Sequence, residues 1–170
     1  MNLSETNFPR RLEADDSAEK IREVLAARQI KLSPQGRLEV PMLAWTEALA
    51  RAIAKARLQG RVRLGFEEIA QKLAAEEKGF AALRQKTPEL QQDRISRLLL
   101  FSSDGAERLY RHIEQILAEH APRVLGCRLD MDGKKLGEAV FGKNAAVKVI
   151  LVEHKDAVSD VLSALIAKEA

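Results

Sequence analysis

The stretch AAVKVILVEHKDAVSDVLSALIA, residues 145–167, decides the fold class. Its first eight residues, 145–152, form a short and almost continuous apolar run rich in β-branched side chains, which is typical of a strand covered on both faces. Asp156 then offers a helix N-cap, and apolar residues recur behind it at helical spacing: Val158, Val161, Leu162, Leu165 and Ile166. A strand this apolar cannot stand alone in water, so the segments before it must cover it.

The composition is that of an ordinary globular protein of 170 residues, with 46% hydrophobic and 31% charged residues. A chain of this length can bury a core without disulfides, and its single cysteine, Cys127, is expected to be a small buried hydrophobe. No apolar run reaches membrane-spanning length, and the first residues lack the apolar stretch of a signal peptide. We therefore expect a soluble, cytoplasmic protein that has no contact with membranes.

Hydrophobic spacing predicts a mainly helical N-terminal two-thirds that carries one β-hairpin. Residues 1–13 show no period and predict a loose arm, and Asp16 with Glu19 resembles a capping box that opens a helix. Alternating residues at 30–32 and 37–40 flank the tetrapeptide Ser-Pro-Gln-Gly, which has the residue preferences of a type I turn. These two runs predict the hairpin.

The middle of the chain is predicted to be helical apart from a short strand at 61–64. Pro41 suits the first turn of a helix that ends at Gly60, and this is the most regular helical pattern in the chain. Further helices are expected in three places, each with apolar residues at helical spacing: over 66–85, from Thr87, and from Asp104 with Glu107 as a capping box.

The C-terminal third is predicted to be a β-α-β-α unit with strands at 124–129 and 145–152. A right-handed crossover would make these two strands parallel neighbours. The expected fold class is therefore α+β, with the helical N-terminal two-thirds packed against this unit. One domain over 14–170 is expected, and the alternative is a helical module and a small α/β module that meet near 121–123.

Residues 66–85 resemble a helix-turn-helix, a DNA-binding unit whose second helix enters the major groove. Counted from Phe66, the fifth position is the small residue Ala70, and apolar residues occupy the positions that pin the two helices together: Ile69, Leu73, Phe80 and Leu83. The match is incomplete, because Ala74 stands where a turn glycine is usual and no strand pair for a wing follows. The alternative is an ordinary amphipathic helix pair. Three cations would face the nucleic acid: Lys78, Arg84 and Lys86.

An acid-free window over 51–63 carries five cations: Arg51, Lys55, Arg57, Arg61 and Arg63. The whole chain has 28 basic and 25 acidic residues, a net charge of only +3, so any basic surface must be local. Lysine and arginine side chains on one surface bind a nucleic-acid backbone by releasing its counterions. The alternative is a solvated helix face whose cations favour the helix C-terminus.

Three polar residues near the ends of the C-terminal strands are the candidates for metal binding or catalysis. Asp130 and Asp132 could hold a hard cation, and His154 follows the last strand, where sites of α/β proteins often lie. The alternatives are a polar turn for the two acids and a helix cap for His154. The other two histidines are eight residues apart, not the four that a helical metal pair needs.

The sequence contains no Walker, dinucleotide-binding, nucleophile-elbow or paired-cysteine motif. We therefore expect no cofactor, and the leading hypothesis is a non-enzymatic binding or regulatory protein that contacts another protein or a second copy of itself. A small strand count that leaves sheet edges to cover adds to this expectation. Nucleic-acid binding through the 51–63 window is the alternative, and a small enzyme with a site near Asp130, Asp132 and His154 is the third hypothesis.

Overall fold

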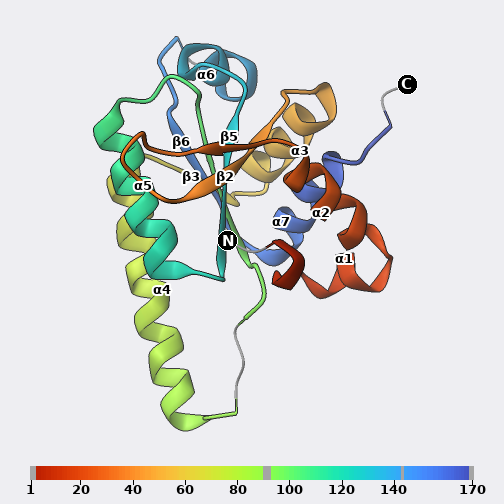
Figure 1. Ribbon diagram of the computed structural model, residues 1–170, viewed down its shortest axis with the longest axis vertical. Helices are drawn as coiled ribbons and strands as arrows, with labels where there is room; N and C mark the ends of the chain where they lie inside the picture. Colours follow the sequence, from red (N-terminus) through yellow and green to blue (C-terminus); the bar gives the residue numbers. More distant parts are fainter. Residues whose placement is uncertain (1–2, 90–92, 143, 169–170) are drawn as a thin grey trace.

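The computed structural model describes residues 3–89, 93–142 and 144–168. These residues form a six-stranded mixed sheet with the strand order β1-β2-β5-β4-β6-β3 (Figure 1). The strands are β1 (Gln29–Lys31), β2 (Glu39–Leu43), β3 (Val62–Leu64), β4 (Arg97–Phe101), β5 (Val124–Leu129) and β6 (Val149–Val152). Together with the helices on both faces, this sheet confirms the predicted α+β class.

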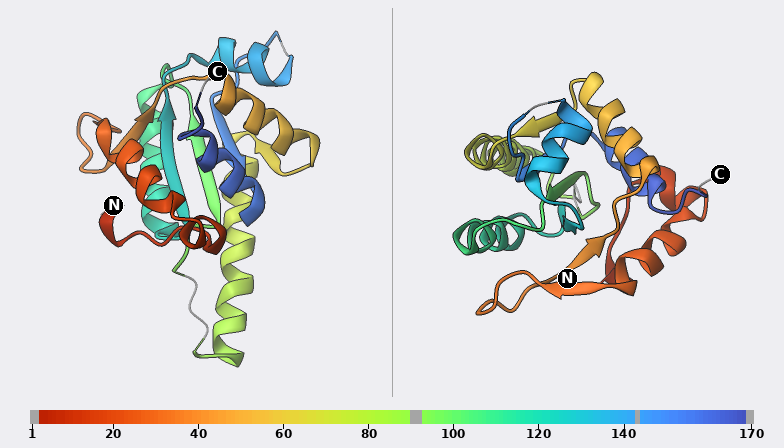
Figure 2. Two further views of the ribbon diagram at one scale, coloured as in Figure 1. Left: turned by 90° about the vertical axis from the view of Figure 1, so that its right-hand side faces the viewer. Right: turned by 90° about the horizontal axis from the view of Figure 1, so that it is seen from above.

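The helices of the described residues lie in two layers. They are the short 3-10 helix η1 (Leu3–Glu5), α1 (Arg10–Ala14), α2 (Ser17–Ala27), α3 (Glu47–Leu58), α4 (Phe66–Lys86), α5 (Glu107–His120), α6 (Gly133–Phe141) and α7 (Lys155–Ala164). Helices α4 and α5 cover one face of the sheet, whereas α1, α2, α3 and α7 cover the other (Figure 2). None of these helices is both long and apolar enough to cross a membrane.

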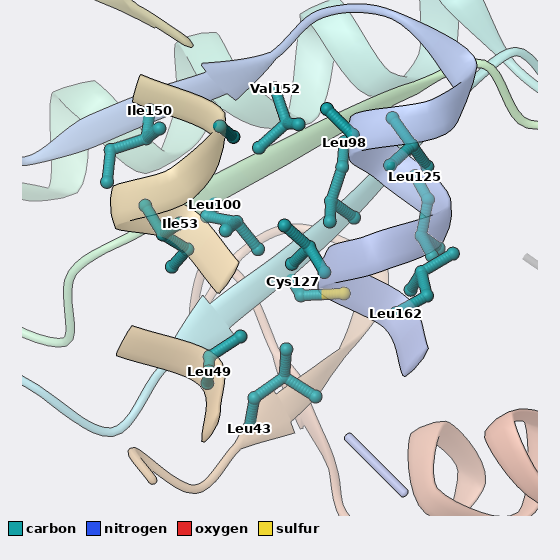
Figure 3. Close-up of a cluster of buried hydrophobic side chains, with 14 of the residues drawn as sticks. Leu43, Leu49, Ile53, Leu98, Leu100, Leu125, Cys127, Ile150, Val152 and Leu162 are labelled. Atoms are coloured by element: carbon teal, nitrogen blue, oxygen red, sulfur yellow. The ribbon is translucent and has the colours of Figure 1, made fainter. Parts of the chain in front are cut away.

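The central strands are buried on both faces, so alternate residues enter two separate cores. In β4, Leu98 and Leu100 pack toward α3 and α7, whereas Leu99 and Phe101 pack toward α4 and α5. Figure 3 shows part of the first core, where the side chain of Cys127 lies among aliphatic side chains. Burial raises the pKa of the Cys127 thiol and keeps it neutral, which confirms its predicted role as a small hydrophobe.

The hairpin prediction is right in its pairing and wrong in its extent. Strand β1 pairs antiparallel with β2, and the Gly36 N–H donates to the carbonyl of Ser33, which closes the predicted turn. Strand β2 continues through Pro41, where a helix was expected to begin. Helix α3 begins only at Glu47, where the hydroxyl of Thr46 caps its N-terminus.

The helix expected from Thr87 onward is wrong, because residues 97–101 form the buried strand β4. A short apolar run has the same appearance in a strand covered on both faces and in a buried helix. Strand pairing decides between these two structures, because β4 lies between β5 and β6 and pairs with both.

Strands β5 and β6 are not the parallel neighbours that the crossover rule predicted. Strand β4 lies between them, parallel to β5 and antiparallel to β6. Strand β6 therefore runs opposite to β5, and the handedness rule, which holds for parallel strands, does not apply. The sheet also mixes strands from both sides of residues 121–123, where a module boundary was considered.

Residues 3–13 pack against the rest of the chain instead of forming the expected loose arm. Phe8 and Leu12 are fully buried, and the Ile95 N–H donates to the carbonyl of Asn7 at 2.8 Å. Because the apolar residues of this segment are few and widely spaced, no helical or strand period revealed that they enter the core.

Asp104 does not cap α5 as expected, but joins the loop after β4 to α6. Its carboxylate accepts a hydrogen bond from the Gly133 N–H at 2.9 Å and pairs with Lys148 at 2.8 Å. Partial burial opposes ionisation of Asp104, but these partners outweigh it and lower the pKa of Asp104 to about 2. The N-cap of α5 is Ala106, which makes no side-chain hydrogen bond.

We expect Asp104→Asn to lower the free energy of unfolding by about 1 kcal/mol near pH 7, since the half-exposed ion pair and the charge-assisted hydrogen bond are both weakened. The pKa of Asp104 is lower in the folded chain, so its stabilisation is present above about pH 4 and is lost as the pH falls toward 2. Urea unfolding should therefore show a difference between the two proteins that is constant from about pH 7 to about pH 4 and shrinks from about pH 4 to about pH 2. A difference that stays constant down to about pH 2 would contradict this role.

Candidate functional site

The helix-turn-helix predicted over 66–85 is wrong, because these residues belong to one continuous helix, α4. The residues expected to form the turn are mostly good helix formers, and Gly79 inside the helix costs only about 1 kcal/mol. The three cations assigned to the recognition helix lie on the exposed second half of α4: Lys78, Arg84, which pairs with Glu77, and Lys86.

The basic window 51–63 is divided between α3 and β3, and most of its cations have partners. Four of them contact other residues of the chain: Arg51 pairs with Glu47, Lys55 with Asp160 and Arg63 with Glu153, and Arg57 lies over the ring of Phe141. Arg61 has no ion pair among the described residues. These partners reduce the charge that is free to meet phosphates, and nucleic-acid binding by this window stays a prediction.

The structure does not bring Asp130, Asp132 and His154 together. The two acids follow β5, whereas His154 follows β6, which runs the opposite way, so they lie at opposite ends of a sheet about 20 Å long. Asp132 caps α6 by accepting from the Lys135 N–H at 2.8 Å, and His154 Nδ1 accepts from the Asp156 N–H at the start of α7. The helix-cap alternative is confirmed for His154, and Asp132 also proves to be a helix cap. Within the described residues, no cluster of histidine, cysteine and acidic side chains could hold a metal ion.

An apolar pocket that no sequence pattern indicated lies between the β1–β2 hairpin and α5. This cavity, named the hairpin pocket, has a volume of about 390 Å³. Its apolar walls come from the hairpin, α5 and β5: Leu38, Val40, Pro41, Leu117, Ala118 and Leu125. In Figure 1 the hairpin reaches from the sheet across to α5. Residues of both elements line the pocket.

Pro41 explains why the sheet opens at this place. Strand β2 pairs with β5 through two residue pairs: Met42 with Arg128 and Leu43 with Leu129. Pro41 has no N–H to offer, so the ladder cannot continue toward the N-terminal half of β5. Gly126 of β5 lines the resulting gap and lets α5 come close, since a Cβ there would lie 2.5 Å from the side chain of Leu117.

Glu114 of α5 holds the tip of the hairpin over the pocket. The Arg37 N–H donates to Glu114 Oε1 at 3.3 Å, and a Cβ at Gly36 would collide with the same carboxylate. The local signals of Gly36 and Pro41, a turn residue and a helix start, did not indicate a binding site. A proline in a strand that pairs on both sides interrupts the pairing, and this is the signal that could have indicated the site.

Comparison with known proteins gives no guide to function. No model of a known protein family matches this chain, and no characterised protein is similar to it at a significant level. Function must therefore be inferred from the geometry of the chain itself.

Proposed function

We propose that this chain is a binding protein that takes a small, uncharged apolar molecule into the hairpin pocket. The observation that carries the proposal is a concave cavity of about 390 Å³ whose walls are mostly apolar. Ligand sites in proteins are typically cavities of roughly 300–1,000 Å³ that combine apolar walls with a few polar groups. Filling these walls would gain about 25 cal/mol for each Å² of apolar surface removed from water.

The polar residues of the pocket favour an uncharged ligand. Arg37 brings one positive charge to the lining, whereas Glu39 and Glu114 bring two negative charges. This mixture has no strong excess of either sign, so it offers little attraction to an anion or a cation. Gln29 also lines the pocket, and its amide can hydrogen-bond a carbonyl or hydroxyl group of the ligand.

Fluorescence titration with N-phenyl-1-naphthylamine, a neutral probe that brightens in apolar surroundings, tests this proposal. We expect saturable binding of one probe per chain with a Kd on the order of 10 μM. Ala118 lines the pocket on an exposed part of α5, so Ala118→Phe places a ring at the mouth of the pocket without disturbing the core. This variant should bind the probe at least about tenfold more weakly, a loss of about 1.4 kcal/mol.

Ala82→Phe is the matched control, because Ala82 is an exposed alanine on α4 outside the pocket lining. It adds the same aromatic surface elsewhere and should leave probe binding unchanged. The absence of saturable binding, or an equal loss in both variants, would contradict the proposal.

Contact with another protein or with a second copy of the chain stays a prediction, with one observation in its favour. The last residues of α4, 81–86, are all exposed, and Leu83 is 48% exposed. This end of α4 projects beyond the sheet in Figure 1.

A further inference from the structure

A second pocket lies beside the N-terminal ends of β4 and β5 and shares no lining residue with the hairpin pocket. It has a volume of about 360 Å³ and is bounded by the N-terminal segment, α4 and the starts of the two strands. Three arginines line it, and it is named the arginine pocket for them: Arg10, Arg94 and Arg123.

Arg123 forms the inner wall of the arginine pocket, and its side chain is only 6% exposed. Its Nη1 donates to Glu76 Oε1 at 3.0 Å, and its guanidinium carbon lies 4.9 Å from the centre of the Phe80 ring. Its Nε and Nη2 atoms are buried and have no hydrogen-bond partner among the described residues. Burying a charged group is costly unless it is paired, so this guanidinium favours a second negative charge nearby.

One partly buried carboxylate, that of Glu76, pairs with two guanidiniums next to this pocket. Arg97 donates to both oxygens of Glu76, with Nη2 at 2.7 Å from Oε2, and Arg123 takes the remaining position. Burial opposes ionisation of Glu76, but Arg97 and Arg123 outweigh it and lower the pKa of Glu76. The carboxylate is therefore ionised, and this partly buried cluster of two arginines and one glutamate keeps one excess positive charge.

Two further arginines add positive charge at the mouth of the pocket. Arg94 donates through Nη1 to the carbonyl of Phe8, which is a neutral partner. Arg10 is exposed and makes no hydrogen bond or ion pair with any described residue. Asp93 is the one acid in the lining. Since Glu76 and Arg97 balance each other, three arginines against one aspartate leave the pocket with a net charge of +2.

We propose that the arginine pocket binds the phosphate group of a small phosphorylated molecule. A phosphate monoester carries about −1.5 to −2 charges at pH 7 and three strong acceptor oxygens, which match the net charge of the pocket and the forked donors of arginine. Arg10 and Arg94 contact the oxygens, Ser96 adds a hydroxyl, and Arg123 attracts the group from the inner wall. The volume of about 360 Å³ suits a small molecule rather than a polymer.

Isothermal titration calorimetry with phenyl phosphate at constant ionic strength tests this inference. We expect saturable binding at pH 7.5 with a Kd on the order of 1 mM or tighter, and at least about tenfold weaker binding of acetate, which carries one charge. Arg10→Gln and Arg94→Gln should each weaken phenyl phosphate binding by about tenfold. Arg10 is exposed and unpaired, so its replacement leaves the fold intact. A loss of phenyl phosphate binding in this variant therefore reports on the pocket and not on unfolding.

Arg108→Gln is the matched control, because Arg108 is an exposed arginine on α5 outside the pocket and the variant has the same net charge as Arg10→Gln. It should change the Kd by less than about twofold, since distant exposed charges are screened. Ala118→Phe should also leave phenyl phosphate binding unchanged, so the proposals for the two pockets are tested independently of each other. The absence of saturable binding, or an equal loss in Arg108→Gln and Arg10→Gln, would overturn the inference.

Discussion

Glu76→Gln is expected to lower the free energy of unfolding by about 3–5 kcal/mol, the cost of leaving buried charges without their partner. The substitution keeps the size of the side chain and removes only its charge. Arg97 and Arg123, whose side chains are 18% and 6% exposed, would then face each other without a carboxylate between them. Urea unfolding, followed by the fluorescence of the single tryptophan and by circular dichroism, measures the effect.

Glu77→Gln is the matched control for this prediction. Glu77 is the next residue of α4 and pairs with Arg84, but both side chains are more than 40% exposed. Exposed pairs contribute about 0.2–1 kcal/mol, so this variant should lose no more than that. Similar losses in the two variants would mean that the partly buried ion pairs of Glu76 stabilise the fold no more than an exposed ion pair does.

Gly137→Ala is expected to lower the free energy of unfolding by about 2–3 kcal/mol, although alanine is the better helix former. A Cβ at Gly137 of α6 would lie 2.1 Å from the carbonyl oxygen of Ala145 in the segment before β6. This segment is anchored, since the Val147 N–H donates to the carbonyl of Gly133 at 2.9 Å. Backbone atoms must therefore move to admit the methyl group, and thermal or urea unfolding measures the cost.

Gly79→Ala is the matched control, for which we expect a change of the opposite sign in the free energy of unfolding. Gly79 lies inside α4, and a Cβ there would meet nothing within 4 Å. We expect this variant to gain about 0.5–1 kcal/mol, because alanine loses less backbone entropy in a helix. If Gly137→Ala were stabilised by a similar amount, the close approach of α6 to residue 145 would be refuted.

Elements whose signal lies within a few residues were predicted from the sequence alone. The turn at 33–36 depends on local turn chemistry, and strand β5 and helix α7 depend on hydrophobic runs and spacing within one element. The apolar run 145–152 predicted a strand covered on both faces, and its second half forms β6 (Val149–Val152). The α+β class follows from these local patterns.

Other assignments failed because two structures share one local pattern. The apolar run of β4 fits a buried strand and a buried helix equally well, and only its pairing with β5 and β6 separates the two. Pro41 suits the first turn of a helix, but it also suits a strand at the place where a ladder ends. In both cases the neighbours in space decided the outcome.

The positions of the candidate sites were decided by tertiary structure. The insertion of β4 between β5 and β6 reversed β6 and separated His154 from Asp130. The arginine pocket joins Arg10, Arg94 and Arg123, which are tens of residues apart and share no local pattern. Residues 145–167 thus determined that a covered sheet must form, because apolar surface has to leave water. The strand order and the end of the β2–β5 ladder at Pro41 determined where its pockets lie. Neither could be predicted from the sequence, because pairing between distant segments leaves no trace in local spacing.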